Sequence, residues 1–138
     1  MNNFLKGENM TETQNTKPYN LEERTLQFTR NVISFINSTP KTTGNFEVGR
    51  QVIRAAGSIG ASYIEAADSF GKTDFLMRIR ICRKGSKESR YWLNLVDVGD
   101  DPAKRMKLEL LDEADQLTKI FGAILQKAKP EKESVPKT

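Results

Sequence analysis

The positive charge of this chain is concentrated between Arg50 and Arg90. That stretch holds nine basic and four acidic residues, a net charge of +5, whereas all 138 residues together carry +4. Lysine and arginine at this density can bind the phosphates of a nucleic acid. The residues that we predict to form a nucleic-acid-binding surface are Arg50, Arg54, Arg80, Arg83, Lys84, Lys87 and Arg90.

The last five of these residues share one side of a helix. At about 100° per residue they fall within about 120° of one another, with Arg78 on the other side. The alternative is a solvated helix face neutralised by i, i+4 ion pairs, but Glu88 is the one acidic residue among them. Tyr91 and Trp92 adjoin this side and can stack on unpaired bases, although core or interface packing is the commoner role of a lone tryptophan.

Enzymatic chemistry has little support in the composition. The chain has no histidine and one cysteine, Cys82, which removes the commonest general base, the commonest metal ligand and every Ser-His or Cys-His pair. Glu65 and Asp68 stand at i, i+3, but carboxylate-bridged metal sites in bundles use Glu-x-x-His. We expect no catalytic residues, no metal and no cofactor. A divalent-metal enzyme using Glu65 and Asp68 is the less favoured alternative.

The length suits a single domain in a reducing cytoplasm. No apolar run approaches the roughly 18 residues that span a membrane, and a lone Cys82 cannot form an intramolecular disulfide. Residues 1–18 and 129–138 are polar and lack periodicity, so they are expected to be disordered around a domain at 19–128.

Four periodic segments predict four helices. The first begins at Asn20, with Glu23 at capping-box spacing, and ends before Pro40. The second follows the Lys41–Gly44 turn, and its apolar residues recur at spacings of three and four from Phe46 to Phe70.

The third segment carries the clearest pattern, starting after Thr73 as N-cap. Its apolar and small residues alternate at spacings of four and three: Phe75, Ile79, Cys82, Ser86, Ser89, Leu93 and Val96. The fourth begins at Asp101 as N-cap with Pro102 at its first position. Short connections make sequential helices antiparallel, so we predict an all-α, up-down-up-down four-helix bundle.

Some apolar residues lie outside the stripes that build one bundle. Aligned exposed hydrophobic side chains indicate a second contact surface. Gly57 and Gly60 each cost about 1 kcal/mol in a helix interior, which close packing against another backbone would offset. The residues predicted to form a homo-oligomer interface are Leu26, Ile33, Gly57, Met77, Ile81, Trp92 and Leu95.

Three stretches carry a resemblance to a known family: NLEERTLQF, GRQVIRAAGSIGASYIEA and KTDFLMRIRICRKGSKESRYWL. They resemble the four-helix-bundle proteins encoded within intervening sequences of bacterial 23S ribosomal RNA genes. The likeness runs from about Asn20 to Ala128. The positions that match are Arg54, Ser58, Ile59, Ala61, Glu65, Asp74, Phe75, Ser86, Glu88, Ser89, Arg90, Trp92 and Leu93. The chain departs from the family at Gly85 and at Ala66–Asp68, which puts the local helix geometry in question.

The resemblance implies a homopentameric ring and kinship with the accessory proteins of diversity-generating retroelements, in which a basic surface is implicated in binding nucleic acid and reverse transcriptase. It implies no enzymatic activity. We therefore predict a homo-oligomeric protein that binds nucleic acid, structured RNA in particular, and that has no membrane partner. The alternative is a scaffold that docks a partner protein through its apolar and basic surfaces.

Overall fold

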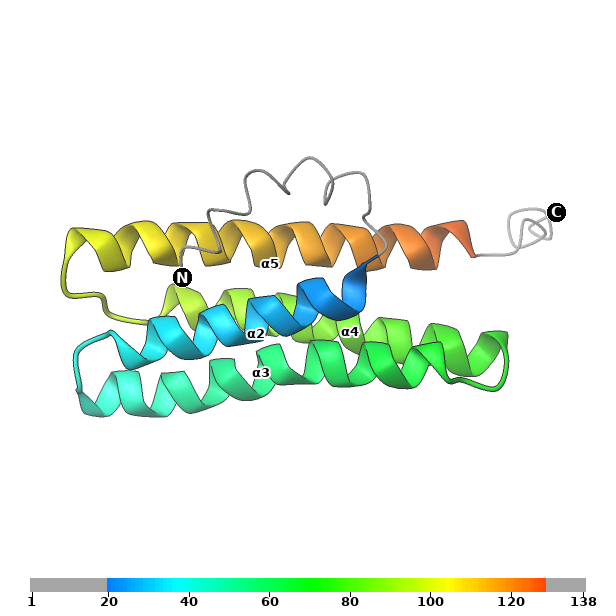
Figure 1. Cartoon of the computed structure of the whole chain (residues 1–138), viewed down its shortest axis with the longest axis horizontal. Coiled ribbons are helices and arrows are strands. Elements are labelled where there is room, and N and C mark those ends of the chain that lie inside the picture. Colours follow the sequence, from blue (N-terminus) through cyan, green and yellow to red (C-terminus); the bar gives the residue numbers. More distant parts are fainter. Residues whose placement is uncertain (1–19, 129–138) are drawn as a thin grey trace, which may run out of the picture.

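The computed structural model describes residues 20–128, which form helices and no strand within that range (Figure 1). The helices are α2 (Leu21–Asn37), α3 (Thr43–Ala67), α4 (Lys72–Asn94) and α5 (Asp101–Lys127). The prediction of an all-α fold is confirmed. The predicted disordered segments, 1–18 and 129–138, lie outside the described residues.

Successive helices run in opposite directions, which gives the predicted bundle (Figure 1). Contacts between α3 and the segment of α4 run in reverse order along the two: the side chain of Asn45 bonds to Asp97, while further along α3 the carbonyl oxygen of Ile59 lies 3.5 Å from the Sγ of the earlier residue Cys82. Helices α2 and α4 each contact α3 and α5. Because α2 and α4 make no close backbone contact with each other, they occupy opposite corners of the bundle.

The core follows the predicted periodicity. On α4 the seam residues Ile79, Cys82, Ser86, Ser89 and Leu93 are all fully buried. The two serine hydroxyls donate to carbonyl oxygens one turn earlier, at 2.8–2.9 Å, so these buried polar groups are satisfied.

The predicted apolar stripe of α3 is wrong at three residues, of which Ala67 is exposed while its neighbour Ala66 is buried. Phe46 is 66% exposed and Phe70 is 98% exposed. Phe70 lies beyond the helix, which ends at Ala67, and Phe46 lies in the first turns of α3 on the side turned away from the core.

The helix boundaries differ by one to three residues from those predicted. α3 begins at Thr43 because Thr42 caps it, its side chain accepting a bond from the amide of Asn45 at 3.0 Å. α5 is capped by Asp100, which accepts from the amide of Ala103 at 2.9 Å, and not by Asp101. α4 begins at Lys72, so Thr73 lies inside it.

The start of α2 also departs from its predicted chemistry. Asn20 is the N-cap residue, but its side chain makes no capping hydrogen bond. The predicted capping box with Glu23 is therefore wrong, although the helix begins where that pattern placed it. Glu22 and Glu23 still lie in the first turn, where the helix dipole favours negative charge.

Gly85 is a point of close approach between α3 and α4. A Cβ placed on Gly85 would lie 2.6 Å from Ser58 Oγ, 3.0 Å from Ile59 Cγ1 and 3.1 Å from the carbonyl oxygen of Ala55. The helix is continuous through this residue, so the departure from the family pattern does not disturb it. The absence of a side chain here lets the two backbones come together.

The glycines of α3 differ from each other. A Cβ on Gly60 would lie 3.1 Å from Thr25 Oγ1 of α2, which agrees with the predicted close packing. A Cβ on Gly57 would meet no atom within 4 Å in the described range. Gly57 is therefore not needed for packing inside the bundle.

Candidate nucleic-acid interface

One side of α4 is lined with cations. Because the seam residues occupy the inward side, the remaining positions point outward. Arg80, Arg83, Lys84 and Lys87 are all exposed, and we call these four residues the basic face. Together with Glu88 they surround a single open hollow on the surface.

The cations of the basic face have no carboxylate partners in the described range. None of its four residues takes part in an ion pair with another residue in the range 20–128. Three other arginines are neutralised: Arg24 by Glu113 at 2.7 Å, Arg78 by Asp74 at 3.4 Å and Arg90 by Asp115 at 2.7 Å. The positive charge of the basic face is therefore available to a ligand.

The seven predicted binding residues are only partly brought together. Arg90 is directed to α5, where Asp115 binds it, so it is not an equal member of the basic face. Arg54 of α3 lines a second hollow together with Lys84. Arg50, one turn before Arg54, is exposed and lines neither hollow.

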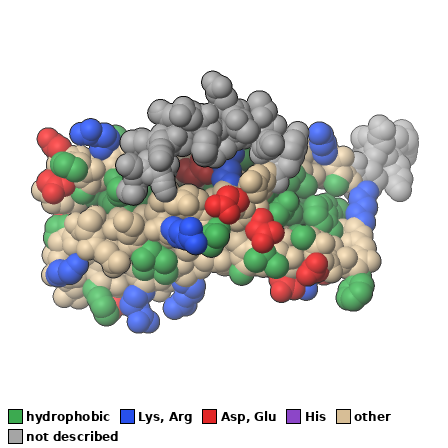
Figure 2. Space-filling view, in the orientation of Figure 1, with side chains coloured by type: hydrophobic (Ala, Val, Ile, Leu, Met, Phe, Trp, Pro, Cys, Tyr) green, Lys and Arg blue, Asp and Glu red, His purple; other side chains and the backbone are tan. Residues whose placement is uncertain are grey.

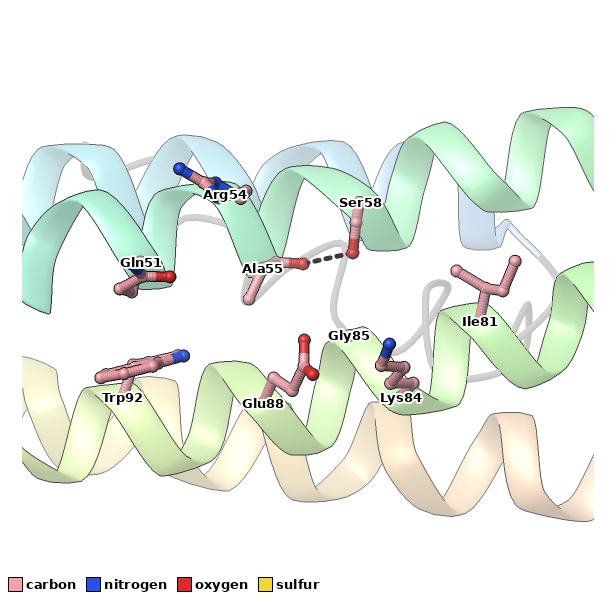
Figure 3. A pocket seen from close by; sticks show the side chains of 9 residues that line it. All are labelled: Gln51, Arg54, Ala55, Ser58, Ile81, Lys84, Gly85, Glu88 and Trp92. Carbon is pink, nitrogen blue, oxygen red and sulfur yellow. Dashed lines mark hydrogen bonds between the residues drawn. The ribbon is translucent and has the colours of Figure 1, made fainter.

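The second hollow is a groove between α3 and α4, with a volume of about 190 Å³ (Figure 3). The close approach of Gly85 to Ala55 forms its floor. The side chains around it are Gln51, Arg54, Ser58, Ile81, Lys84, Glu88 and Trp92. Lys84 and Glu88 border both hollows, so the groove adjoins the basic face directly.

Five of the predicted interface residues are large side chains exposed over more than a third of their surface, and four of these lie outside the α3–α4 groove. Leu26 and Ile33 of α2 are 45% and 39% exposed, and Met77 of α4 and Leu95, which follows it, are 45% and 51% exposed. Since α2 and α4 occupy opposite corners, these are two different apolar surfaces. Figure 2, taken from the side of α2, shows hydrophobic side chains between charged ones.

The other predicted interface residues lie elsewhere. Ile81 is 37% exposed, and both it and Trp92 line the α3–α4 groove. The ring of Trp92 is half-buried and packs edge-on against Tyr91, with centroids 5.0 Å apart. Gly57 lies on α3 with open space above it.

The carboxylates considered for catalysis are on the surface, whereas the single thiol is buried. Glu65 and Asp68 are exposed, and Asp68 lies just after the last residue of α3. No group of three or more metal-binding side chains occurs among residues 20–128. Burial raises the pKa of Cys82 to about 12, so its thiol is protonated at neutral pH.

Several residues of these surfaces are not evident from the sequence pattern. Gln51 and Ser58 reach the groove only because Gly85 brings α4 close, and Asp115 meets Arg90 through the register of α4 against α5. The position of Glu88 among cations is the one signal that the sequence offers. No described helix is both long and apolar enough to cross a membrane.

These features define a class of protein: an antiparallel four-helix bundle with a core of apolar and small side chains, and with its charged groups on the outer helix faces. Comparison with known proteins gives the family. The model described as "23S rRNA-intervening sequence protein" matches residues 19–123, and the chain belongs to this family. The resemblance found in the sequence is confirmed.

A solved structure shows the same fold. It is a protein of unknown function from the S23 ribosomal protein family of Bacteroides thetaiotaomicron, 20% identical, with a TM-score of 0.64. The match covers 75% of this chain and 96% of the other. No protein with a curated description matches the chain.

Proposed function

We propose that this bundle binds structured RNA through the basic face, without catalysing a reaction. The observation that carries the proposal is the clustering of four exposed cations around one hollow. Arg24, Arg78 and Arg90 each have a carboxylate partner, whereas the four residues of the basic face surround one hollow without one in the described range. The family description supports RNA as the polyanion.

The physical basis is the release of counterions. Each lysine or arginine that neutralises a phosphate displaces a counterion, so affinity falls with salt in proportion to the number of contacts. Such contacts fix position without reading sequence. The proposal includes a cytoplasmic location, which is where the sequence predicts the protein to be.

The test is a salt titration of RNA binding. Arg80, Arg83, Lys84 and Lys87 are changed together to alanine, and the affinity for a structured RNA is measured between low and physiological salt. The slope of log affinity against log salt should become shallower by about 3, since each lost contact removes about 0.7 to 0.9. The matched control removes four exposed cations elsewhere: Arg30, Lys41, Arg105 and Lys127.

Two outcomes would contradict the proposal. One is an equal loss of slope in both variants, since that would mean a general effect of net charge. The other is an absence of RNA binding together with a protein partner that remains bound after nuclease treatment. The second outcome would support the scaffold function in its place.

A second proposal is self-association, favoured by the two apolar surfaces. Leu26 and Ile33 lie on α2, and Met77 and Leu95 lie on or next to α4, at the opposite corner of the bundle. A contact between two different surfaces is head-to-tail, and it closes into a ring when the rotation allows. A pentamer, as the family resemblance implies, is one such ring.

Mixing two variants tests this directly. Leu26→Asp disables the first surface and Leu95→Asp disables the second, so each variant alone should be monomeric by light scattering. An equimolar mixture should form a dimer and nothing larger, because one intact surface of each kind remains. A wild-type protein that is monomeric at micromolar concentration would overturn the proposal, and so would a mixture that stays monomeric.

A further inference from the structure

The groove between α3 and α4 contains a negative charge that phosphate binding does not explain. Glu88 lies on the same side of α4 as the basic face and borders both hollows. No lysine or arginine of the described residues forms an ion pair with it. A carboxylate repels phosphate, but it accepts hydrogen bonds from N–H groups. Its position suits a ligand that has both a phosphate and an N–H edge.

Trp92 supplies a flat surface at one end of the same groove. In Figure 3 its indole nitrogen and the carboxylate of Glu88 both point into the space between α3 and α4, and Gln51 lies opposite Trp92. An aromatic ring binds an unpaired base by stacking on its flat face, whichever base it is. The groove, of about 190 Å³ and open to solvent along one side, can admit a planar base.

The charged lining disfavours an apolar occupant. A helix from another copy would bury Arg54, Lys84 and Glu88 together, and taking unpaired charges out of water costs several kcal/mol per ion. A nucleotide leaves these groups partnered. Its phosphate meets Lys84 and Arg54, and its base meets Glu88.

We infer that the groove is a subsite for one unpaired guanine of an RNA whose backbone lies on the basic face. Guanine presents two adjacent donors, N1–H and N2–H, which a carboxylate accepts together. Trp92 stacks on the base and Glu88 binds its Watson–Crick edge, as in single-stranded RNA recognition. This assigns Ile81 and Trp92 to a ligand site in place of the oligomer interface, and it rests on the RNA function proposed above.

The single tryptophan of the chain makes the test direct. Tryptophan emission is followed while short single-stranded RNAs are added: an oligouridine with one central guanosine, the same RNA with inosine, which lacks the N2 amino group, and the same RNA with an abasic site. The guanosine RNA should quench Trp92 and bind about fivefold or more tightly than the inosine RNA. The abasic RNA should leave the emission unchanged.

Glu88→Gln should remove the preference for guanosine over inosine while leaving oligouridine binding as tight as before or tighter. Glu109→Gln, an exposed carboxylate on α5, is the matched control and should keep the preference. If Glu88 has only a structural role, Glu88→Gln changes the stability of the protein but not the ratio of its affinities for the guanosine and inosine RNAs. Thermal melting of both variants is therefore measured as well.

Three results separate the possible failures. Salt-dependent RNA binding without a Trp92 response would overturn the guanine subsite and leave the basic face intact. A lack of binding both to these RNAs and to the structured RNA of the salt titration would overturn both. A change in Trp92 emission that follows protein concentration without RNA would show that a second copy occupies the groove, and would overturn the subsite.

Discussion

The contact between α3 and α4 and the contact between α2 and α5 hold the bundle together in different ways. At α3–α4 the backbones approach over Gly85, with Ala55 and Ser58 opposite. At α2–α5 the backbones come close at fewer points. The two helices are joined there by an ion pair between the long side chains of Arg24 and Glu113. The first contact has no long side chain that could adjust, whereas the second depends on two of them. Substitutions at α3–α4 should therefore have the larger effects.

The largest effect is expected at the end of the α3–α4 contact, where Asn45 is buried. Its side chain donates to the carbonyl oxygens of Pro40 and Asp97, at 3.0 and 2.8 Å, and accepts from the amide of Asp97 at 2.9 Å. Asn45→Ala leaves the amide and the carbonyl oxygen of Asp97 without partners in the described range, while the Pro40 carbonyl oxygen keeps its bond from the Thr42 amide. The substitution should lower the free energy of unfolding by about 3 kcal/mol. Urea denaturation measures this, with the exposed Asn94→Ala as the control. Equal losses in the two variants would show that the buried hydrogen bonds of Asn45 do not stabilise the contact.

Gly85→Ala comes next, because the added methyl group would lie within 3.1 Å of a backbone oxygen that cannot rotate away. Overpacking outweighs the gain in helix propensity, so the free energy of unfolding should fall by about 2 kcal/mol. Chemical denaturation of the purified variant is the measurement. An increase in the free energy of unfolding would mean that α3 and α4 can move apart without cost. The α3–α4 contact would then be as adjustable as the α2–α5 contact.

Cys82, in the same contact, should make stability depend on pH. Burial raises its pKa from 9.0 to about 12, so in the pH range between these values the unfolded chain loses the proton while the folded chain keeps it. Stability is retained below pH 9 and lost as the pH rises. Between about pH 8 and about pH 10 the wild type should lose about 1.4 kcal/mol more than Cys82→Ala does. If the free energies of unfolding of the two proteins change with pH in the same way, the raised pKa of Cys82 is contradicted.

Gly57→Ala is the counterpart of the Gly85 substitution on the open side of α3. No atom of residues 20–128 outside the local helix lies within 4 Å of the added methyl group, so only helix propensity changes. The free energy of unfolding should rise by about 1 kcal/mol. If the same variant also loses self-association in light scattering, Gly57 belongs to the interface between copies. If the variant is less stable than the wild type as a monomer, the space around Gly57 is not open.

The smallest effect is expected at α2–α5. Arg24→Met removes a two-point contact in which Nε and Nη2 donate to Glu113 at 2.7 and 2.9 Å. Both side chains are more than a quarter exposed, so the loss should be at most about 1 kcal/mol and should shrink at about 1 M salt. Arg30→Met on the same helix is the control. A loss as large as that of Gly85→Ala would remove the distinction between the two contacts.

Much of the fold is predictable because it depends on local periodicity. The alternation of four and three along α4 identifies Ile79, Cys82, Ser86, Ser89 and Leu93 as buried, whether or not they are apolar, since position on the helix decides which side faces the core. The predicted seam is confirmed at these residues. The serines are the instructive cases, because composition alone would place them outside.

The errors arise where periodicity carries no information. It does not fix where a helix stops, so it places Phe70 in the core although α3 ends at Ala67. It also does not fix the register between helices, which decides that Arg90 meets Asp115 and that Gly85 lies over Ser58. The basic face is predictable from α4 alone, whereas the groove beside it requires two helices in register.

The small residues Gly85, Ser86 and Ser89 also affect the shape of the outer surface around α4. The distance between packed helices depends on the side chains at their contact, so a helix lined with small residues lies deeper in the bundle than one lined with leucine. Its outer side chains then rise from a depression, and both hollows border α4. A grooved surface of this kind can contact a convex partner over a larger area than it can contact a flat partner.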